Sequence, residues 1–185
     1  MDKLKELNKN DMIQRIIIWF MLYSIAGWIY ETILEVFVYR TGFSNRGFLY
    51  GPYLPIYGFG ALIFVFALQG IKKRKVKIGK IDITILVIFL GVMLISTTIE
   101  LLGSYIAELF VNKPLWDYEK YIFDFDGRIA LDPSIRFGIG GTVFIYLLQP
   151  SHEAMCDQMS KKDLTVAAAA ILVIFITDFI LTLTL

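Results

Sequence analysis

The chain has 185 residues, of which 57% are hydrophobic and 19% are charged, and its 18 basic and 17 acidic residues leave a formal net charge of +1. Soluble domains average about 45–50% apolar and about 25% charged residues, so this composition indicates a small integral membrane protein and excludes a disordered chain. The charge balance argues against a nucleic-acid binder, and the single cysteine, Cys156, excludes a disulfide scaffold.

Five apolar segments approach the roughly 20 residues that a helix needs to cross a bilayer. They are continuous, whereas the strands of a membrane barrel would alternate apolar and polar residues with a period of two. We therefore predict an all-α fold, a polytopic membrane helix bundle that forms a single membrane domain. In chain order, the five predicted transmembrane helices cover residues 16–39, 53–68, 83–99, 135–148 and 164–185, and the fourth is the weakest.

The distribution of basic residues predicts how the helices are oriented. Residues 72–80, after the second predicted helix, contain six basic residues and no acidic one. Such clusters stay on the cytoplasmic side, and we favour this role as a topology signal over a role as a lipid-binding patch. The N-terminus, with its cytoplasmic segment 1–12, is then inside, and five spans place the C-terminus outside.

The loop between the first two predicted helices, TGFSNRGFLYGPYLPIYGFG, is dense in glycine, proline and aromatic residues. Asn45, Arg46 and Gly47 predict an ordered turn, because asparagine and glycine both tolerate positive φ. Gly58 and Gly60 lack side chains and would let another helix approach closely. We therefore expect a tight connection followed by a packing seam.

The outer segment, residues 106–133, is the longest stretch outside the predicted helices and joins the third to the fourth. Its core, LWDYEKYIFDFDGRIALDP, interleaves aromatic and charged residues, as the interfacial belts of membrane proteins do. It is too aromatic to be disordered. We predict that it is structured and folds over the outer mouth of the bundle.

Three ionisable residues, Glu31, Glu100 and Arg136, fall in the outer half of the predicted helices. Such groups cost roughly 2.5–3.5 kcal/mol each in a bilayer and indicate a functional site by default. We expect Glu31 and Glu100 to face the bundle interior and to pair with two or more of Arg46, Arg128 and Arg136. The network would be either structural, fixing the loops, or the wall of an outward-facing polar cavity that binds a substrate or ion.

Two further acids in the predicted helices are less informative. Glu35 lies one helical turn after Glu31 and is expected to reach the membrane interface, where water solvates it. Asp178, in the last predicted helix, either joins the network or lies close enough to the outer surface to be solvated.

Motifs of the common catalytic centres are absent from the sequence. It contains no HExxH, no GxSxG and no phosphate-binding GxxxxGK[ST]. His152 and Cys156 are four residues apart, but a metal site needs further ligands. We predict no catalytic residue, no metal and no cofactor, and we expect that the chain is not an enzyme.

Three motifs occur together in order: GWIYETILE, NRGFLYGPYLPIYGFGAL and WDYEKYIFDFDGRIAL. Over roughly residues 16–148, the chain resembles the bacterial family of small membrane proteins named ABC-transporter permeases (type IV, CmpB-like). The resemblance implies a multi-pass protein of the bacterial cytoplasmic (inner) membrane. Arg136 departs from the family pattern, which has an apolar entry to the fourth helix. The expected polar site consists of Glu31, Asn45, Arg46, Tyr57, Glu100, Trp116, Asp117, Tyr118, Arg128 and Arg136.

These observations favour a transport-related membrane protein, either a permease or a substrate-binding membrane subunit, with a polar cavity in the outer half of the bilayer. One alternative is a non-catalytic sensor or assembly factor that binds a partner through the WDY segment, residues 116–118. Another is a membrane enzyme that handles lipid head groups. The expected partners are the lipid bilayer, an unknown small-molecule substrate, and either a second copy or a separate energy-coupling subunit.

Overall fold

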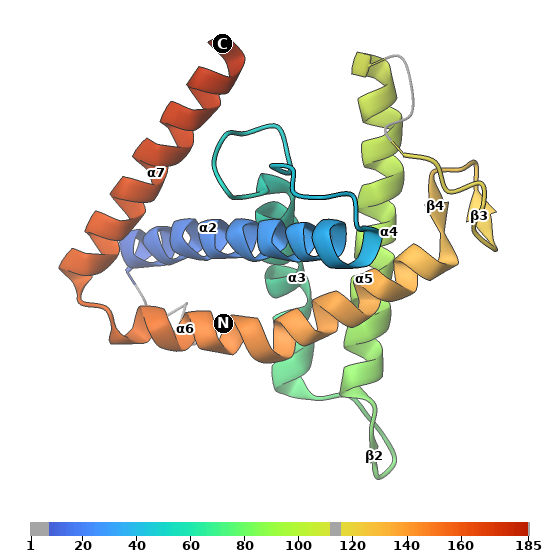
Figure 1. Ribbon diagram of the computed structural model, residues 1–185. Coiled ribbons are helices and arrows are strands. Elements are labelled where there is room, and N and C mark those ends of the chain that lie inside the picture. Colours follow the sequence, from blue (N-terminus) through green and yellow to red (C-terminus); the bar gives the residue numbers. More distant parts are fainter. Residues whose placement is uncertain (1–7, 112–115, 185) are drawn as a thin grey trace. The chain divides into compact units, whose positions relative to one another are not determined.

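The computed structural model describes residues 8–111 and 116–184, and within them the chain is mostly helical (Figure 1). Residues 1–7 of the predicted cytoplasmic segment and residues 112–115 of the predicted outer segment lie outside this description. Two π-helical segments, η1 (Leu34–Tyr39) and η2 (Phe144–Leu148), extend α-helices. The α-helices are α2 (Lys9–Ile33), α3 (Pro55–Arg74), α4 (Thr84–Val111), α5 (Leu131–Val143), α6 (Gln149–Gln158) and α7 (Lys161–Thr184).

Two short antiparallel hairpins are the β-structure of the described residues. In the first, β1 (Lys77–Ile78) pairs with β2 (Ile81–Asp82) in the connection between α3 and α4. In the second, β3 (Asp124–Phe125) pairs with β4 (Ile129–Ala130) just before α5. The second hairpin confirms that the outer segment is structured.

Four helical segments of the described chain are long and apolar enough to cross a membrane: Lys9–Val38, Pro55–Arg74, Thr84–Ile106 and Lys161–Thr184. They match the first, second, third and fifth predicted spans and confirm an all-α membrane protein. The predicted fourth span is helical as α5 and η2 but is not among the four. Its α-helical part, α5, has 13 residues. The first turns of α5 contain the charged residues Asp132 and Arg136, which form an ion pair (2.7 Å). The orientation in the membrane stays a prediction.

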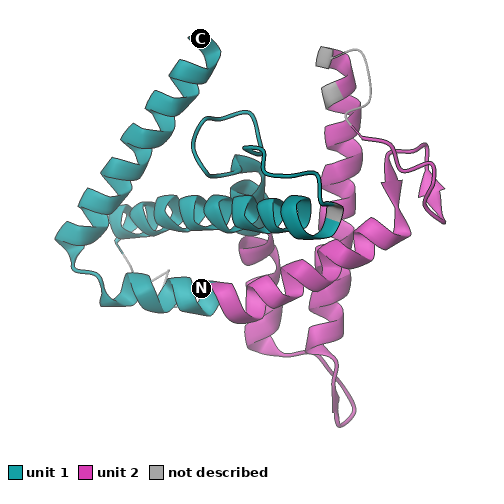
Figure 2. Ribbon diagram, viewed as in Figure 1, with its two compact units in different colours: residues 1–63, 149–185 teal, residues 64–148 magenta. Residues whose placement is uncertain are grey.

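The chain divides into two compact units (Figure 2). Unit 1 comprises Met1–Ile63 and Gln149–Leu185, and unit 2 comprises Phe64–Leu148, so the division falls within α3. Unit 1 holds α2, η1, the beginning of α3, α6 and α7. Unit 2 holds the rest of α3, both hairpins, α4, α5 and η2. That the whole chain acts as a single membrane domain stays a prediction.

The core of unit 1 joins α2, the loop that follows η1, and α7. Met21 of α2 is buried with Leu49 and Tyr53 of the loop. Ile171 and Phe175 of α7 pack against this cluster. The loop is therefore part of the core, which explains why a segment so rich in glycine and proline has a defined conformation.

The core of unit 2 lies between α3, α4 and the helical segment formed by α5 and η2. Ile88 and Val92 of α4 are fully buried against Leu68 of α3 and Ile145 of η2. These branched apolar side chains fill the space between the helices, and α5 lies along α4 over much of its length. The packing explains why α5, although polar at its beginning, is held as a helix.

Of the two glycines expected to form a packing seam, only Gly58 makes a close approach, and the glycines Gly138 and Gly140 of α5 differ in the same way. A Cβ at Gly58 would lie 2.7 Å from the ring of Phe20, and one at Gly138 would lie 2.6 Å from the ring of Phe89. At Gly60 and Gly140, no other described atom lies within 4 Å of such a Cβ. The packing role expected for Gly60 is therefore wrong, because Gly60 lies two residues from Gly58 and points to another side of α3.

Substitution by alanine should affect stability differently at the closely packed Gly58 and at the unpacked Gly60. Gly58→Ala should lower the free energy of unfolding by about 1–3 kcal/mol, the usual cost of overpacking. Gly60→Ala should be neutral or stabilising by up to about 1 kcal/mol, because alanine favours helix. Thermal unfolding in detergent micelles measures both, and equal losses for the two variants would contradict the packing seen at Gly58.

Candidate functional site

The expected site residues lie in both units, and each set is described within its own unit. Unit 1 contains Glu31, Asn45, Arg46 and Tyr57. Unit 2 contains the remaining six residues: Glu100, Trp116, Asp117, Tyr118, Arg128 and Arg136.

In unit 1, Glu31 of α2 accepts a hydrogen bond from the hydroxyl of Tyr57 at the start of α3. The Tyr57 ring lies directly on Gly27, where an added Cβ would overlap it. Gly27 is one helical turn before Glu31 and shares its face of α2, so the missing side chain lets the ring reach along the helix to the carboxylate. Glu31 is therefore bonded to a tyrosine and not, as expected, to an arginine.

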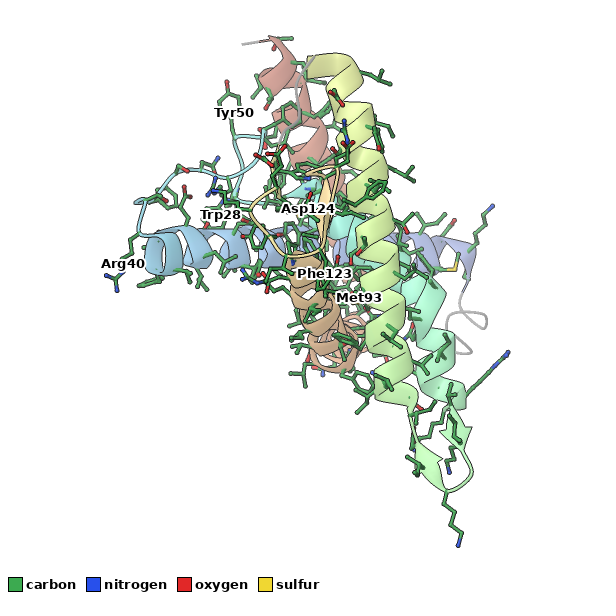
Figure 3. The ribbon with its side chains drawn as sticks, turned by 90° about the vertical axis from the view of Figure 1, so that its right-hand side faces the viewer. Trp28, Arg40, Tyr50, Met93, Phe123 and Asp124 are labelled. Atoms are coloured by element: carbon green, nitrogen blue, oxygen red, sulfur yellow. The ribbon has the colours of Figure 1, made fainter. Side chains whose placement is uncertain are left out.

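The loop after η1 is ordered by a network around Asn45. The indole Nε1 of Trp28 donates to Asn45 Oδ1 (2.8 Å), and Asn45 Nδ2 donates to the carbonyl oxygens of Leu49 (3.2 Å) and Tyr50 (2.9 Å). Gly47 has a φ of +89°. These bonds confirm the ordered turn that the sequence predicts. The side chain of Tyr50 points away from α2 (Figure 3).

Arg46 pairs with Glu35 and not with Glu31. Its Nε lies 2.9 Å from Glu35 Oε2, and the hydroxyl of Ser44 donates to the same carboxylate at 2.9 and 3.0 Å. Glu35 is 6% exposed, so the expectation that water solvates it at the interface is wrong. The loop folds back over η1 and supplies polar partners in place of water.

Asp178 of α7 holds the same loop from the other side. Its carboxylate accepts hydrogen bonds from the backbone N–H groups of Tyr50 (3.1 Å) and Gly51 (2.9 Å) and from the hydroxyl of Tyr53. Asp178 is 9% exposed. The sequence left its role open, and the relevant signal was a single acid within the apolar segment 164–185, which requires buried donors.

A second polar cluster of unit 1 connects α2 to α6 and was not recognised in the sequence. Arg15 donates to Asp157 Oδ1 (2.7 Å) and to the carbonyl oxygen of Cys156 (3.2 Å). The Tyr23 hydroxyl donates to Gln149, whose amide donates to Glu153 Oε1 (2.9 Å). The available signal was the spacing of Arg15, Trp19 and Tyr23, which are four residues apart and therefore share one helix face.

The environment of His152 and Cys156 is polar but holds no metal-binding arrangement. The His152 ring lies against Tyr23 at 4.9 Å. Burial lowers the pKa of His152 and raises that of Cys156, so both side chains favour their neutral forms. Among the described residues, no group of three or more His, Cys, Asp or Glu side chains could hold a metal ion.

In unit 2, Glu100 lies on α4 and is bonded to the outer segment. The Tyr118 hydroxyl donates to Glu100 Oε1 at 2.7 Å. The other carboxylate oxygen, Oε2, is buried and has no hydrogen-bond partner among the residues that the structure describes. Glu100 is therefore bonded to a tyrosine, as Glu31 is, and one of its oxygens is left available.

Arg128 fastens the second hairpin to the C-terminal half of α4. Its guanidinium donates to Glu108 Oε2 (2.5 Å), Asp126 Oδ2 (2.9 Å) and Ser104 Oγ (2.9 Å), and lies over the Tyr105 ring at 4.0 Å. The hydrogen bonds with Asp126 and Glu108 raise the pKa of Arg128, which keeps it charged. Three donors and one flat face are thus used at once, as only arginine allows.

The WDY segment lies along the inner side of this hairpin. Trp116 Nε1 donates to the carbonyl oxygen of Arg128 (2.9 Å), and the backbone N–H of Tyr118 donates to the carbonyl oxygen of Gly127 (2.8 Å). Asp117 Oδ1 accepts the N–H of Glu119 (2.8 Å). The structure thus brings together Glu100, Trp116, Asp117, Tyr118 and Arg128.

Arg136 stands apart from this cluster. It forms an ion pair with Asp132 one helical turn earlier, and its side chain is 58% exposed. The expected pairing of Arg136 with a membrane glutamate is replaced by this local pair, because both residues lie on the same face of α5.

The turn that precedes β3 is apolar and exposed. Ile122 is 78% exposed and Phe123 is 77% exposed, and Phe123 has a φ of +58°. Phe123 and Asp124 are labelled in Figure 3. A bulky side chain rarely adopts positive φ, so the turn holds Phe123 outward at a cost in backbone strain.

Comparison with known proteins identifies the family. A family model described as "Putative ABC-transporter type IV" matches residues 18–183, which is most of the chain. Searches of curated proteins and of solved structures found no match. The matched range includes all ten site residues expected from the sequence. It also includes, in whole or in large part, the four helical segments that could cross a membrane. The chain therefore belongs to the ABC-transporter type IV family of CmpB-like proteins.

Proposed function

We propose that this transport-related membrane protein is a substrate-binding membrane subunit, and that it binds a small cation, inorganic or organic, at Glu100. The site lies beneath the second hairpin, in the predicted outer half of the membrane. Family membership supports the transport role. The buried carboxylate of Glu100 supports the position of the site and the charge of the ligand.

The observation that carries the proposal is the state of Glu100 Oε2. This oxygen is buried and has no partner among the described residues. A buried acceptor without a partner costs about 1–3 kcal/mol, and more when it is charged. Native proteins contain few such groups, and each needs a reason. A bound cation or N–H donor would satisfy this oxygen and offset the cost.

The surroundings of Glu100 suit ligand binding because they are held in place before a ligand arrives. Tyr118 fixes one carboxylate oxygen at 2.7 Å. Arg128 holds the second hairpin through its bonds to Ser104 and Glu108 of α4, and the backbone N–H of Tyr118 is bonded to Gly127 of that hairpin. Binding to a site whose groups are already ordered loses little conformational entropy.

Energy for transport would come from a separate subunit. The sequence has no GxxxxGK[ST] loop to hold the phosphates of ATP. We therefore propose that the chain associates with a subunit that hydrolyses ATP. The alternative is that it forms a homodimer, which its small size also allows.

A second candidate, a sensor or assembly factor, is favoured by the exposed apolar turn before β3. Trp116 and Tyr118 are bonded within unit 2, so Ile122 and Phe123 are the side chains that could contact a partner. In this case Ile122→Ser/Phe123→Ser should abolish association with the partner and leave cation binding unchanged.

The test measures how cations stabilise the purified protein in lipid nanodiscs. The probes are sodium, potassium, methylammonium and guanidinium, and the readout is the melting temperature, which rises when a ligand binds the folded state. At least one probe should stabilise the wild type and fail to stabilise Glu100→Gln. The glutamine still accepts the Tyr118 hydrogen bond, so the variant should remain folded.

The matched control is Glu119→Gln, which removes an exposed carboxylate of the same segment. It should respond to the probe as the wild type does. The proposal is wrong if no probe stabilises the wild type, or if Glu100→Gln and Glu119→Gln respond equally.

A further inference from the structure

The connection between α3 and α4 is a small ordered element that the ligand site does not use. The backbone N–H of Val76 donates to Thr84 Oγ1 (2.8 Å), and the N–H of Ile83 donates to the carbonyl oxygen of Val76 (2.9 Å). The turn between β1 and β2 contains Gly79 at a φ of +59°. In Figure 1 the hairpin projects beyond the adjoining ends of α3 and α4. We call residues 73–82 the basic hairpin.

The basic hairpin carries a concentrated positive charge. Its five basic residues and one acid give a formal net charge of +4. Asp82 is occupied locally, because it accepts hydrogen bonds from the hydroxyl (2.5 Å) and the N–H (2.9 Å) of Thr84, which lower its pKa. The basic residues, all of them exposed, are Lys73, Arg74, Lys75, Lys77 and Lys80.

Lys72, the sixth basic residue of this stretch, has a different role. Its Nζ donates to the carbonyl oxygen of Ile145 (2.8 Å) and lies over the Tyr146 ring at 4.7 Å. It is therefore part of the packing of unit 2. The structure thus distinguishes one packed lysine, Lys72, from five exposed basic residues. The sequence alone does not make this distinction.

Two isoleucines add an apolar side to the basic hairpin. Ile78 and Ile81 are opposite each other in the strand register and are 67% and 68% exposed. Directly opposed residues project from the same face of a hairpin. The hairpin therefore presents an apolar pair next to lysines, the combination by which peripheral segments bind anionic membrane interfaces.

We infer that the basic hairpin, besides its predicted role as a topology signal, binds anionic lipid head groups, with its lysines on the phosphates and the isoleucine pair in the interface. The exposed isoleucine pair is the observation that the sequence alone did not supply. The inference is independent of the cation site at Glu100. The adjoining membrane segments end at Arg74 and begin at Thr84, so the hairpin starts at the edge of the hydrocarbon. Two residues of strand extend about 7 Å, similar to a head-group layer of about 5–8 Å. This short reach favours lipid over a protein partner in solution.

The test uses a fluorescent label whose emission shifts to the blue as it leaves water. The label is attached to Ile78→Cys in a Cys156→Ser background, which leaves one thiol in the chain. The full-length protein is placed in nanodiscs of phosphatidylcholine with increasing fractions of phosphatidylglycerol. The emission should shift to the blue as the anionic lipid increases, and high salt should reverse the shift, because salt screens exposed charges.

Charge variants test whether the lysines cause the shift. A lysine near an anionic membrane contributes about 1 kcal/mol, or about fivefold in affinity. The variant Lys75→Gln/Lys77→Gln/Lys80→Gln should therefore weaken the response to phosphatidylglycerol about 100-fold. The charge-matched control Lys9→Gln/Lys161→Gln/Lys162→Gln, which alters exposed lysines elsewhere, should keep the response.

A label at Phe123→Cys, in the turn before β3, serves as a positional control. It should not respond to phosphatidylglycerol, because the adjacent Asp124 and the nearby Asp126 are acidic. Three outcomes would overturn the inference. The first is a label at residue 78 that stays in water in every lipid mixture. The second is an equal loss of response in both triple variants. The third is a label that becomes protected only when a partner protein is added.

Discussion

Asp178→Asn is expected to lower the free energy of unfolding by about 2–4 kcal/mol and to release the loop of residues 48–54 from α7. The carboxylate of Asp178 accepts three hydrogen bonds from this loop. An asparagine has nearly the same shape, but its NH₂ group is a donor and faces donors there. Hydrogen bonds to a charged group contribute about 1.5–3 kcal/mol each, and buried donors left without a partner add a further cost.

Asp163→Asn is the matched control on the same helix. Asp163 is exposed and bonded to Ser160 at the beginning of α7 (2.7 Å), and its replacement should cost no more than about 1 kcal/mol. Unfolding in denaturing detergent gives the stability, and hydrogen exchange of residues 48–54 reports the loop. Equal stability of the two variants, with the loop still protected, would show that Asp178 does not hold it.

Arg128→Ala should release the second hairpin from α4 and abolish the proposed cation binding. The substitution removes bonds to Ser104, Glu108 and Asp126 and the contact with the Tyr105 ring, and it leaves two acids near each other. Hydrogen-exchange protection of residues 116–130 should fall by at least about tenfold, because local opening follows the loss of local contacts. Arg128→Lys should recover little, since an ammonium cannot reproduce the arginine fork.

Arg136→Ala provides the control with the same change of side chain. Arg136 forms an exposed pair with Asp132 within one helix, and such pairs contribute about 0.3–0.5 kcal/mol. Protection of the hairpin and cation binding should both match the wild type. A hairpin that stays protected in Arg128→Ala would contradict the fastening role of Arg128. Similar losses in both variants would instead indicate a network that includes Arg136.

The proposed cation site and the Arg128 prediction can be separated experimentally. Glu100→Gln should remove cation binding and leave the hairpin protected, because glutamine still accepts from Tyr118. Arg128→Ala should remove both, because Tyr118 loses its support. If cation binding survives in both Glu100→Gln and Arg128→Ala, although the hairpin opens in Arg128→Ala, the ligand binds elsewhere. The structural role of Arg128 would still hold in that case.

Much of the fold followed from local properties of the sequence. Four of the five predicted spans coincide with helices long and apolar enough to cross a membrane, because a continuous apolar segment can satisfy its backbone in lipid only as a helix. The positive φ of Gly47 was predictable for a similar reason, since it depends on a local preference, whereas Asn45 acts through the hydrogen bonds of its side chain. The segment at residues 135–148 was harder to predict, because its helix is stabilised by packing against α4 and not by its own hydropathy.

The residues of the candidate site were identified largely from the sequence, but their partners were not. An acid in an apolar segment signals that it needs a partner, and Glu31 and Glu100 were recognised in this way, whereas the role of Asp178 was left open. Opposite charge then suggested arginines for the two glutamates. The structure instead gives Glu31 and Glu100 tyrosine hydroxyls from residues 26 and 18 positions away, while Arg46 and Arg128 bind other acids.

By itself, the sequence determined the class of this protein, its long apolar helices and the positions of polar residues within them, because each depends on a short stretch of chain. It did not predict the polar helix α6. Only the tertiary structure decided which polar groups meet. A hydrogen bond requires an alignment of a few tenths of an ångström, and that alignment depends on how loops fold back over helices. The gap at Gly27 and the turn at Gly127 provide it for Tyr57 and Tyr118.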